Sequence, residues 1–166
     1  LRDLAPRMRE RWKDAPVLSA HFPLLDHALD RFMADDYISA TAILYPRIEG
    51  ILRSLHAAIG AHSPLRAAAL AQAAVEPWVA SQVHDFSWLL PQMFRRFLER
   101  VYFADFTPGV PAPLSRHSVD HGVASAADFS SKHASVAILI VDQLRFLLPM
   151  DQPANNAMEP SAPSTT

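Results

Sequence analysis

The chain has 166 residues, of which half are hydrophobic, a formal net charge of −2 and no cysteine. This length suits one domain with a substantial core. The lack of cysteine excludes disulfides, thiol nucleophiles and cysteine-ligated zinc, and it fits a reducing compartment, so we expect a cytoplasmic protein. The slightly acidic balance excludes a global positive field for nucleic acid or anionic membrane, and no apolar run is long enough to span a bilayer. Because the chain begins with Leu1 rather than Met, we expect further sequence upstream.

Hydrophobic periodicity predicts helices along the chain and almost no strands. Residues 1–16 carry the one local basic cluster and are expected to be a solvated helix or a linker. An amphipathic helix is predicted from about residue 24 to residue 35 or 36. A longer helix is predicted over residues 37–59, where Pro46 should kink it and Gly60 should stop it.

Three more helices are predicted over residues 65–75, 88–101 and 126–148. Ser125 and Asp128 form a capping box that should open the last of them, and Pro149 should stop it. Residues 150–166 combine three prolines with polar residues, which is typical of a disordered tail. The sequence therefore predicts an all-α fold, an up-and-down bundle of four to six helices, with its main domain over residues 17–149.

The stretch from Arg116 to His121 places an arginine, two histidines and an aspartate directly after a proline-broken loop. Arginine presents a fixed fork of donors that suits phosphate, and histidine titrates nearest to neutral pH. Together they are the minimum set for metal-free cleavage of a phosphodiester. The alternative is that these six residues only form the solvated start of a helix and have no catalytic role. If the segment spans the turn where the loop enters a helix, free backbone N–H groups should favour an anion there, and Gly122 should allow a break.

His117 and His121 lie four positions apart, a spacing also found in metal sites. His133 or Asp120 could supply a third ligand, but the glutamate and the third ligand of the zinc-protease pattern are missing. We therefore predict no metal and no cofactor.

Glu49 falls on the apolar stripe of the long predicted helix, where a carboxylate is rarely left unpaired. Two partners remain open. Glu49 reaches either Arg116 or His121 and fixes its orientation, or it forms a salt bridge with Arg53 four residues further on. His56, on the inner side of the same helix, is expected to be a core histidine.

The six-residue stretch resembles the signature of the HEPN superfamily, small helical domains of prokaryotic defence and toxin systems that also occur in some eukaryotic nucleases. That signature is an arginine, four to six intervening residues and a histidine, often with a polar residue after the arginine. Arg116, His117 and His121 match it, at the start of a late helix after a loop. Residues 37–53 resemble the long helix of such domains, with an acidic residue among apolar ones. The resemblance covers roughly residues 17–149.

The resemblance implies a metal-independent endoribonuclease, usually a dimer in which two motifs meet across a symmetric interface. His121 would act as general base or acid on the ribose 2′-hydroxyl, and Arg116 would hold the scissile phosphate. His117 would orient one of these groups or contact the phosphate, and Glu49 would fix the site. The partners implied are RNA or a nucleotide, a second copy of the chain, and an upstream domain or antitoxin, with no membrane.

Two other functions remain open. One is a non-catalytic HEPN-like module for dimerisation or for binding a nucleotide or ligand, and the other is an unrelated helical bundle that binds an apolar ligand or partner. A salt bridge of Arg116 within its own chain would favour the module. Convergence of Arg116 and His121 on an open cleft would favour the nuclease, and a large cavity far from Arg116 would favour the third function.

Overall fold

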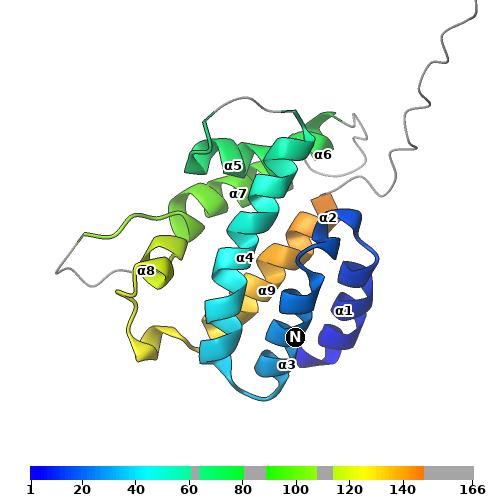
Figure 1. The fold of residues 1–166 in the computed structure, drawn as a ribbon. Coiled ribbons are helices and arrows are strands. Elements are labelled where there is room, and N and C mark those ends of the chain that lie inside the picture. Colours follow the sequence, from blue (N-terminus) through cyan, green and yellow to red (C-terminus); the bar gives the residue numbers. More distant parts are fainter. Residues whose placement is uncertain (61–63, 81–88, 108–113, 148–166) are drawn as a thin grey trace, which may run out of the picture.

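The structure is a computed structural model that describes residues 1–60, 64–80, 89–107 and 114–147. All regular structure in these ranges is helical, which confirms the all-α prediction (Figure 1). Within the described residues, five α-helices have nine residues or more: α1 (Ala5–Lys13), α3 (Phe22–Met33), α4 (Tyr37–Ala58), α7 (Leu89–Phe97) and α9 (Ser131–Leu147). The shorter ones are α2 (Pro16–Ser19), α5 (Ala67–Ala73), α6 (Glu76–Ala80) and α8 (Arg116–Asp120). None of the described helices is long and apolar enough to cross a membrane.

The helix α4 is the central element, with α3 and α9 packed against it and α5 against its C-terminal part (Figure 1). Asp36 caps its start, since the Asp36 carboxylate accepts a hydrogen bond from Ser39 N at 3.0 Å. The helix continues through Pro46 and is followed by Gly60 at φ 67°, so the predicted boundaries are confirmed to within a residue. Its inner face buries Leu44, Ile48, Ile51, Leu52 and Leu55. Each of these side chains contributes roughly 1.5–3 kcal/mol through burial.

The basic N-terminal segment forms a short turn, η1 (Arg2–Leu4), followed by α1. Met8 and Trp12 of α1 are fully buried in the common core, and the Trp12 indole donates to Asp142 on α9 at 3.1 Å. Arg11 donates to the same carboxylate at 2.8 Å and 2.9 Å. The segment is therefore a packed layer of the bundle, and three of its basic side chains, Arg2, Arg9 and Arg11, turn outward to acidic partners.

The predicted helix over residues 88–101 is found as α7, which continues into a π-helical stretch, η2 (Leu98–Tyr102). The amide of Phe103 donates to the carbonyl of Leu98 five residues back, the bond that defines a π-helix. This wider winding keeps Leu98, Tyr102 and Phe103 on one inward face, where all three are buried. Trp88, also expected in this helix, lies outside the described residues.

The start of the last helix was predicted wrongly. The Ser125–Asp128 capping box is present, with Ser125 N donating to Asp128 Oδ2 at 2.8 Å, but it opens a single turn, η3 (Ala126–Asp128). Phe129 then leaves the helical conformation at ψ 63°, and α9 begins at Ser131. A capping box satisfies the amides of one turn and does not require that the helix continue. Pro149 and residues 150–166 lie outside the described residues.

Candidate functional site at the contact of α4 and α8

The motif folds as the five-residue helix α8, capped by the two serines that flank its first turn. Ser115 Oγ accepts from Ser118 N at 3.2 Å, and Ser118 Oγ accepts from Ser115 N at 2.8 Å. His121 ends the helix, and Gly122 follows at φ 67°, as the sequence predicted for a break here. Because the capping box occupies the Ser118 amide, that donor is not free for the anion expected at this helix start.

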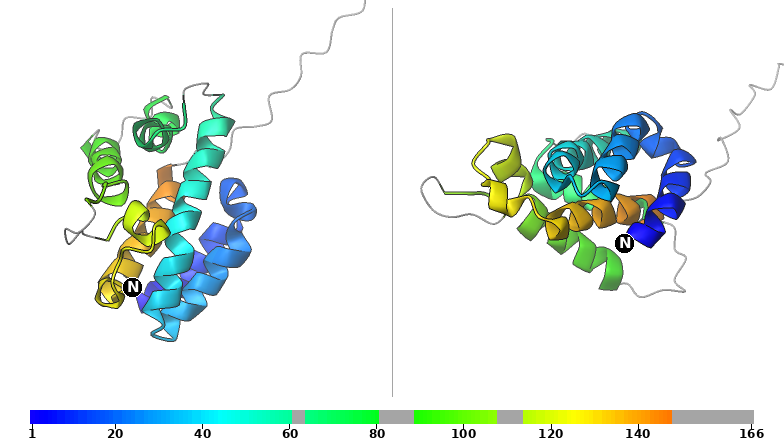
Figure 2. Two further views of the ribbon diagram at one scale, coloured as in Figure 1. Left: turned by 60° about the vertical axis from the view of Figure 1, so that its left-hand side comes forward. Right: turned by 90° about the horizontal axis from the view of Figure 1, so that it is seen from below.

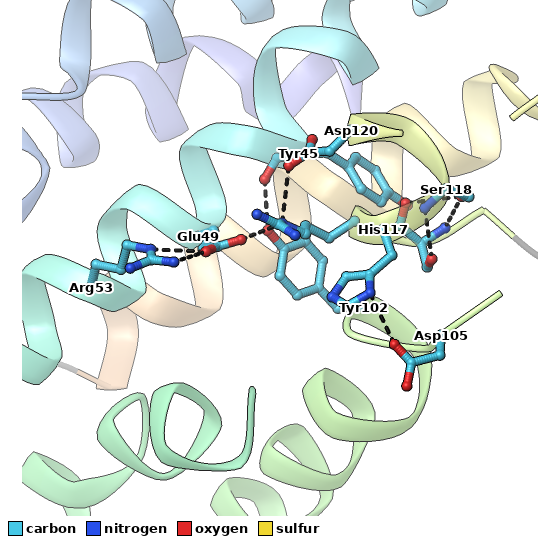
Figure 3. A network of polar contacts seen from close by, with 10 residues as sticks. Tyr45, Glu49, Arg53, Tyr102, Asp105, His117, Ser118 and Asp120 are labelled. Atoms are coloured by element: carbon cyan, nitrogen blue, oxygen red, sulfur yellow. Dashed lines mark hydrogen bonds and ion pairs between the residues drawn. The ribbon is translucent and has the colours of Figure 1, made fainter. Parts of the chain in front are cut away.

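Glu49 joins α4 to α8 (Figure 3). Its side chain is 9% exposed, and its Oε1 accepts from Arg53 Nε at 2.8 Å and from Arg53 Nη2 at 2.6 Å. Its other oxygen, Oε2, forms an ion pair with Arg116 Nε. Both partners that the sequence left open for Glu49 are therefore present.

Arg116 is held between two carboxylates of its own chain. Besides Glu49, Asp120 Oδ2 lies 3.0 Å from Arg116 Nε. The side chains of Arg116 and Asp120 are 24% and 25% exposed, so this end of the cluster meets solvent while Glu49 lies beneath it. With Arg53, the cluster holds two cations and two carboxylates, so its formal charges balance.

A buried tyrosine forms the floor of this cluster. Tyr102, supplied by the π-helical stretch, donates from its hydroxyl to the carbonyl of Tyr45 on α4 at 2.6 Å (Figure 3). Burial raises the pKa of Tyr102 well above its ordinary value, and the nearby Glu49 and Asp120 carboxylates raise it further. Burial also raises the pKa of Tyr45 to about 12. Both phenols therefore stay neutral and tie the site to the core.

The two histidines of the motif lie beside each other, with ring centroids 6.3 Å apart. His117 Nδ1 lies 2.9 Å from Asp105 Oδ1, and Figure 3 shows the ring turned toward that carboxylate. His121 is exposed, and its ring centroid is 5.7 Å from that of Phe106. The arrangement places two imidazoles at the surface, one of them oriented by a carboxylate.

The four site residues predicted from sequence fall into two contacting pairs. Glu49 contacts Arg116, and His117 adjoins His121, while among the described ion pairs Glu49 has none with His121. Sequence reasoning missed Asp105 and Phe106, which precede α8 in the chain by about ten residues. No periodicity or spacing connects them to His117, so tertiary structure alone brings them to the site.

The described residues contain no group of three or more histidine, aspartate and glutamate side chains arranged to hold a metal ion. His133, considered above as a third ligand, instead lies on α9 with its Nδ1 3.1 Å from Ser130 Oγ. Two adjacent imidazoles can supply a general base and a general acid without a metal.

Comparison with known proteins gives no match to a protein-family model, to a curated protein or to a solved structure.

Proposed function

We propose that this chain is a HEPN-like domain that cleaves RNA as a metal-independent endoribonuclease acting through the ribose 2′-hydroxyl. By the same resemblance we assign it to a defence or toxin system. The observation that carries the proposal is the surface pair His117 and His121, whose ring centroids lie 6.3 Å apart, with the Asp105 carboxylate beside Nδ1 of His117. Transesterification at phosphorus needs a base at the attacking oxygen and an acid at the leaving oxygen, and this pair supplies both.

In the proposed reaction, neutral His121 takes the proton from the 2′-hydroxyl, and the 2′-oxygen attacks the adjacent phosphorus. The bond from phosphorus to the 5′-oxygen breaks, and protonated His117 gives its proton to that leaving oxygen. The products are a 2′,3′-cyclic phosphate and a free 5′-hydroxyl. Asp105 supports His117 as the acid because a carboxylate at Nδ1 orients the ring and leaves Nε2 to face the leaving oxygen. DNA is spared because it lacks the 2′-hydroxyl.

Arg116 contributes a permanent positive charge on the same short helix. Its contact with the buried Glu49 fixes the guanidinium on one side, and its partial exposure leaves the group accessible to a phosphate. In the proposal, Arg116 stabilises the charge that builds on the phosphorane oxygens. Glu49 is a positioning residue that holds Arg116 and does not touch the substrate.

The test is cleavage of an end-labelled single-stranded RNA in the presence of EDTA. We expect the wild type to cut and to leave cyclic phosphate ends, while His117→Ala and His121→Ala each lose at least about a hundredfold in rate. His27→Ala is the matched control, since His27 is an exposed histidine on α3. Equal cutting by all four proteins would refute the proposal, because the activity would then come from another site or a contaminant.

A second function is favoured by one observation, the pairing of Arg116 with Glu49 and Asp120 within its own chain. That charge balance suits a non-catalytic HEPN-like module for dimerisation or for binding a nucleotide or ligand, in which the motif holds α8 against α4. A folded wild-type protein that leaves RNA intact would support this function over the nuclease. A second copy of the chain, an upstream domain or an antitoxin would then be the partner to identify.

A further inference from the structure

Two exposed arginines lie shortly before the candidate site in the chain. Arg96 on α7 and Arg100 on η2 are both exposed and lie four residues apart. The chain then reaches Asp105 and Phe106 beside the two histidines. Figure 2 shows that α7 is an outer helix, separated from α1 by α4 and α9. The helix α7 therefore lies on the same side of α4 as α8, which carries the site (Figure 1).

These two cations differ from most other arginines of the described chain in having no ion pair there. Ion pairs with carboxylates are formed by Arg2, Arg9, Arg11, Arg53, Arg95 and Arg116, whereas the exposed Arg7 and Arg66 resemble Arg96 and Arg100 in having none among the described residues. The contrast is clearest on α7 itself, where Arg95 donates to Glu99 at 2.8 Å while its neighbour Arg96 stays unpaired. A chain with a formal net charge of −2 thus keeps two unpaired cations on the described segment that leads to Asp105.

We propose that Arg96 and Arg100 bind the backbone phosphates of a single RNA strand that flanks the bond cleaved at His117 and His121. This inference rests on the proposed function and names how its substrate is held. Residues four apart on a helix are separated by about 6 Å along the axis. That rise is comparable to the separation of neighbouring phosphates on an extended strand, so each guanidinium meets one phosphate.

The site is within reach of this surface. Asp105 lies five positions after Arg100, so their Cα atoms are at most about 18 Å apart even if the chain is fully extended. A strand held by the arginines therefore needs only a few nucleotides to reach the histidines. Phe106 is half-buried beside His121. Its ring offers a face on which a base can stack between the arginines and the histidines.

The same helix also exposes apolar side chains, which would suit an acidic protein segment instead. Leu89 and Met93 are 60% and 58% exposed. They lie toward the start of α7, whereas the arginines lie at the end that runs into the site. Position and charge together favour RNA at Arg96 and Arg100.

The test measures binding separately from cleavage. Fluorescence anisotropy with a labelled single-stranded RNA that is 2′-O-methylated throughout reports binding alone, because the strand cannot be cut. Each phosphate contact on a single strand contributes a slope of about −0.7 to log K against log salt, or about fivefold in affinity at 0.1 M salt relative to 1 M. The double variant R96Q/R100Q should therefore bind about 25-fold more weakly, with a slope smaller by about 1.4.

The matched control is R7Q/K13Q, which removes the same charge from two exposed residues of α1 across the bundle. We expect this variant to bind as the wild type does. Equal weakening in both variants, unchanged binding by R96Q/R100Q, or no binding by the wild type would overturn the inference. Selective weakening in R96Q/R100Q with no cleavage of unmodified RNA by the wild type would support the arginine surface and refute the nuclease. Cleavage of unmodified RNA by the wild type, together with unchanged binding by R96Q/R100Q, would support the nuclease and refute the arginine surface.

Discussion

Replacement of Glu49 by glutamine tests whether this carboxylate joins α8 to α4. Glutamine keeps the size of the side chain and removes its charge. It leaves Arg53 without its carboxylate partner and leaves Arg116 with Asp120 alone. We therefore expect Glu49→Gln to fold, to be less stable, and to hold α8 less firmly.

The magnitude follows from how exposed each partner is. Arg53 is 46% exposed, so its pair with Glu49 is close to a surface salt bridge and contributes about 0.3–0.5 kcal/mol. Arg116 is 24% exposed and forms an ion pair with the nearly buried Glu49 carboxylate, and removing one partner of such a pair leaves the other unsatisfied at a cost of about 1–3 kcal/mol. We expect a loss of about 2 kcal/mol in the free energy of unfolding. For a chain of this size that loss lowers the melting temperature by roughly 4–8 °C.

The assay is urea unfolding of a double-mutant cycle that pairs Glu49→Gln with Arg116→Gln and, separately, with Arg53→Gln. The coupling energy should exceed about 1 kcal/mol for Arg116 and stay below about 0.5 kcal/mol for Arg53. A larger coupling to Arg53 would refute the reasoning, because Glu49 would then stabilise its own helix and not the contact with α8. A Glu49→Gln protein as stable as the wild type would also refute the reasoning.

Three further predictions concern the surroundings of the site. Ser115→Ala removes the cap of α8 and should cost about 1 kcal/mol in urea unfolding, whereas Ser115→Asp should retain most of the stability. Gly122→Ala forces a Cβ into the left-handed conformation at φ 67° and should cost about 1 kcal/mol or more, measured as a lower melting temperature, with Gly122→Asn less costly. Burial raises the pKa of Tyr45 to about 12 and raises that of Tyr102, so above pH 10 the native state binds more protons than the unfolded state, and stability should fall as the pH rises from 10 toward 12. Tyr45→Phe should reduce that fall in urea unfolding at about pH 9 and about pH 11, and an unchanged slope would refute the assignment.

The sequence predicted the central helices well because their signals are strong and local. Asp36 and Gly60 sit at the ends of a long apolar stripe, and α4 is found between them. The start of α9 could not be predicted in the same way. The Ser125–Asp128 box produces the same hydrogen bonds in a single turn as in a long helix, and the departure of the chain at Phe129 leaves no mark in local spacing.

The polar cluster could be predicted in part, for a physical reason. A carboxylate on the buried face of α4 must be paired, so Glu49 required a cation. Local spacing supplied Arg53, and the resemblance supplied Arg116, but nothing in the sequence showed that each oxygen of Glu49 takes one of them. The pairing of His117 with Asp105 depends on how the π-helical stretch directs the following loop, which helical periodicity does not encode.

The contacts of Arg116 are compatible with both functions because its two carboxylate partners differ in depth. Glu49 is nearly buried and already neutralised by Arg53, so it holds Arg116 in place at little electrostatic cost. Asp120 is 25% exposed on a five-residue helix and can turn toward water. A phosphate that approaches the histidines would therefore compete with Asp120 and not with Glu49. In the nuclease, Asp120 is the counterion that the substrate displaces, whereas in a non-catalytic module it stays in place and keeps the cluster neutral.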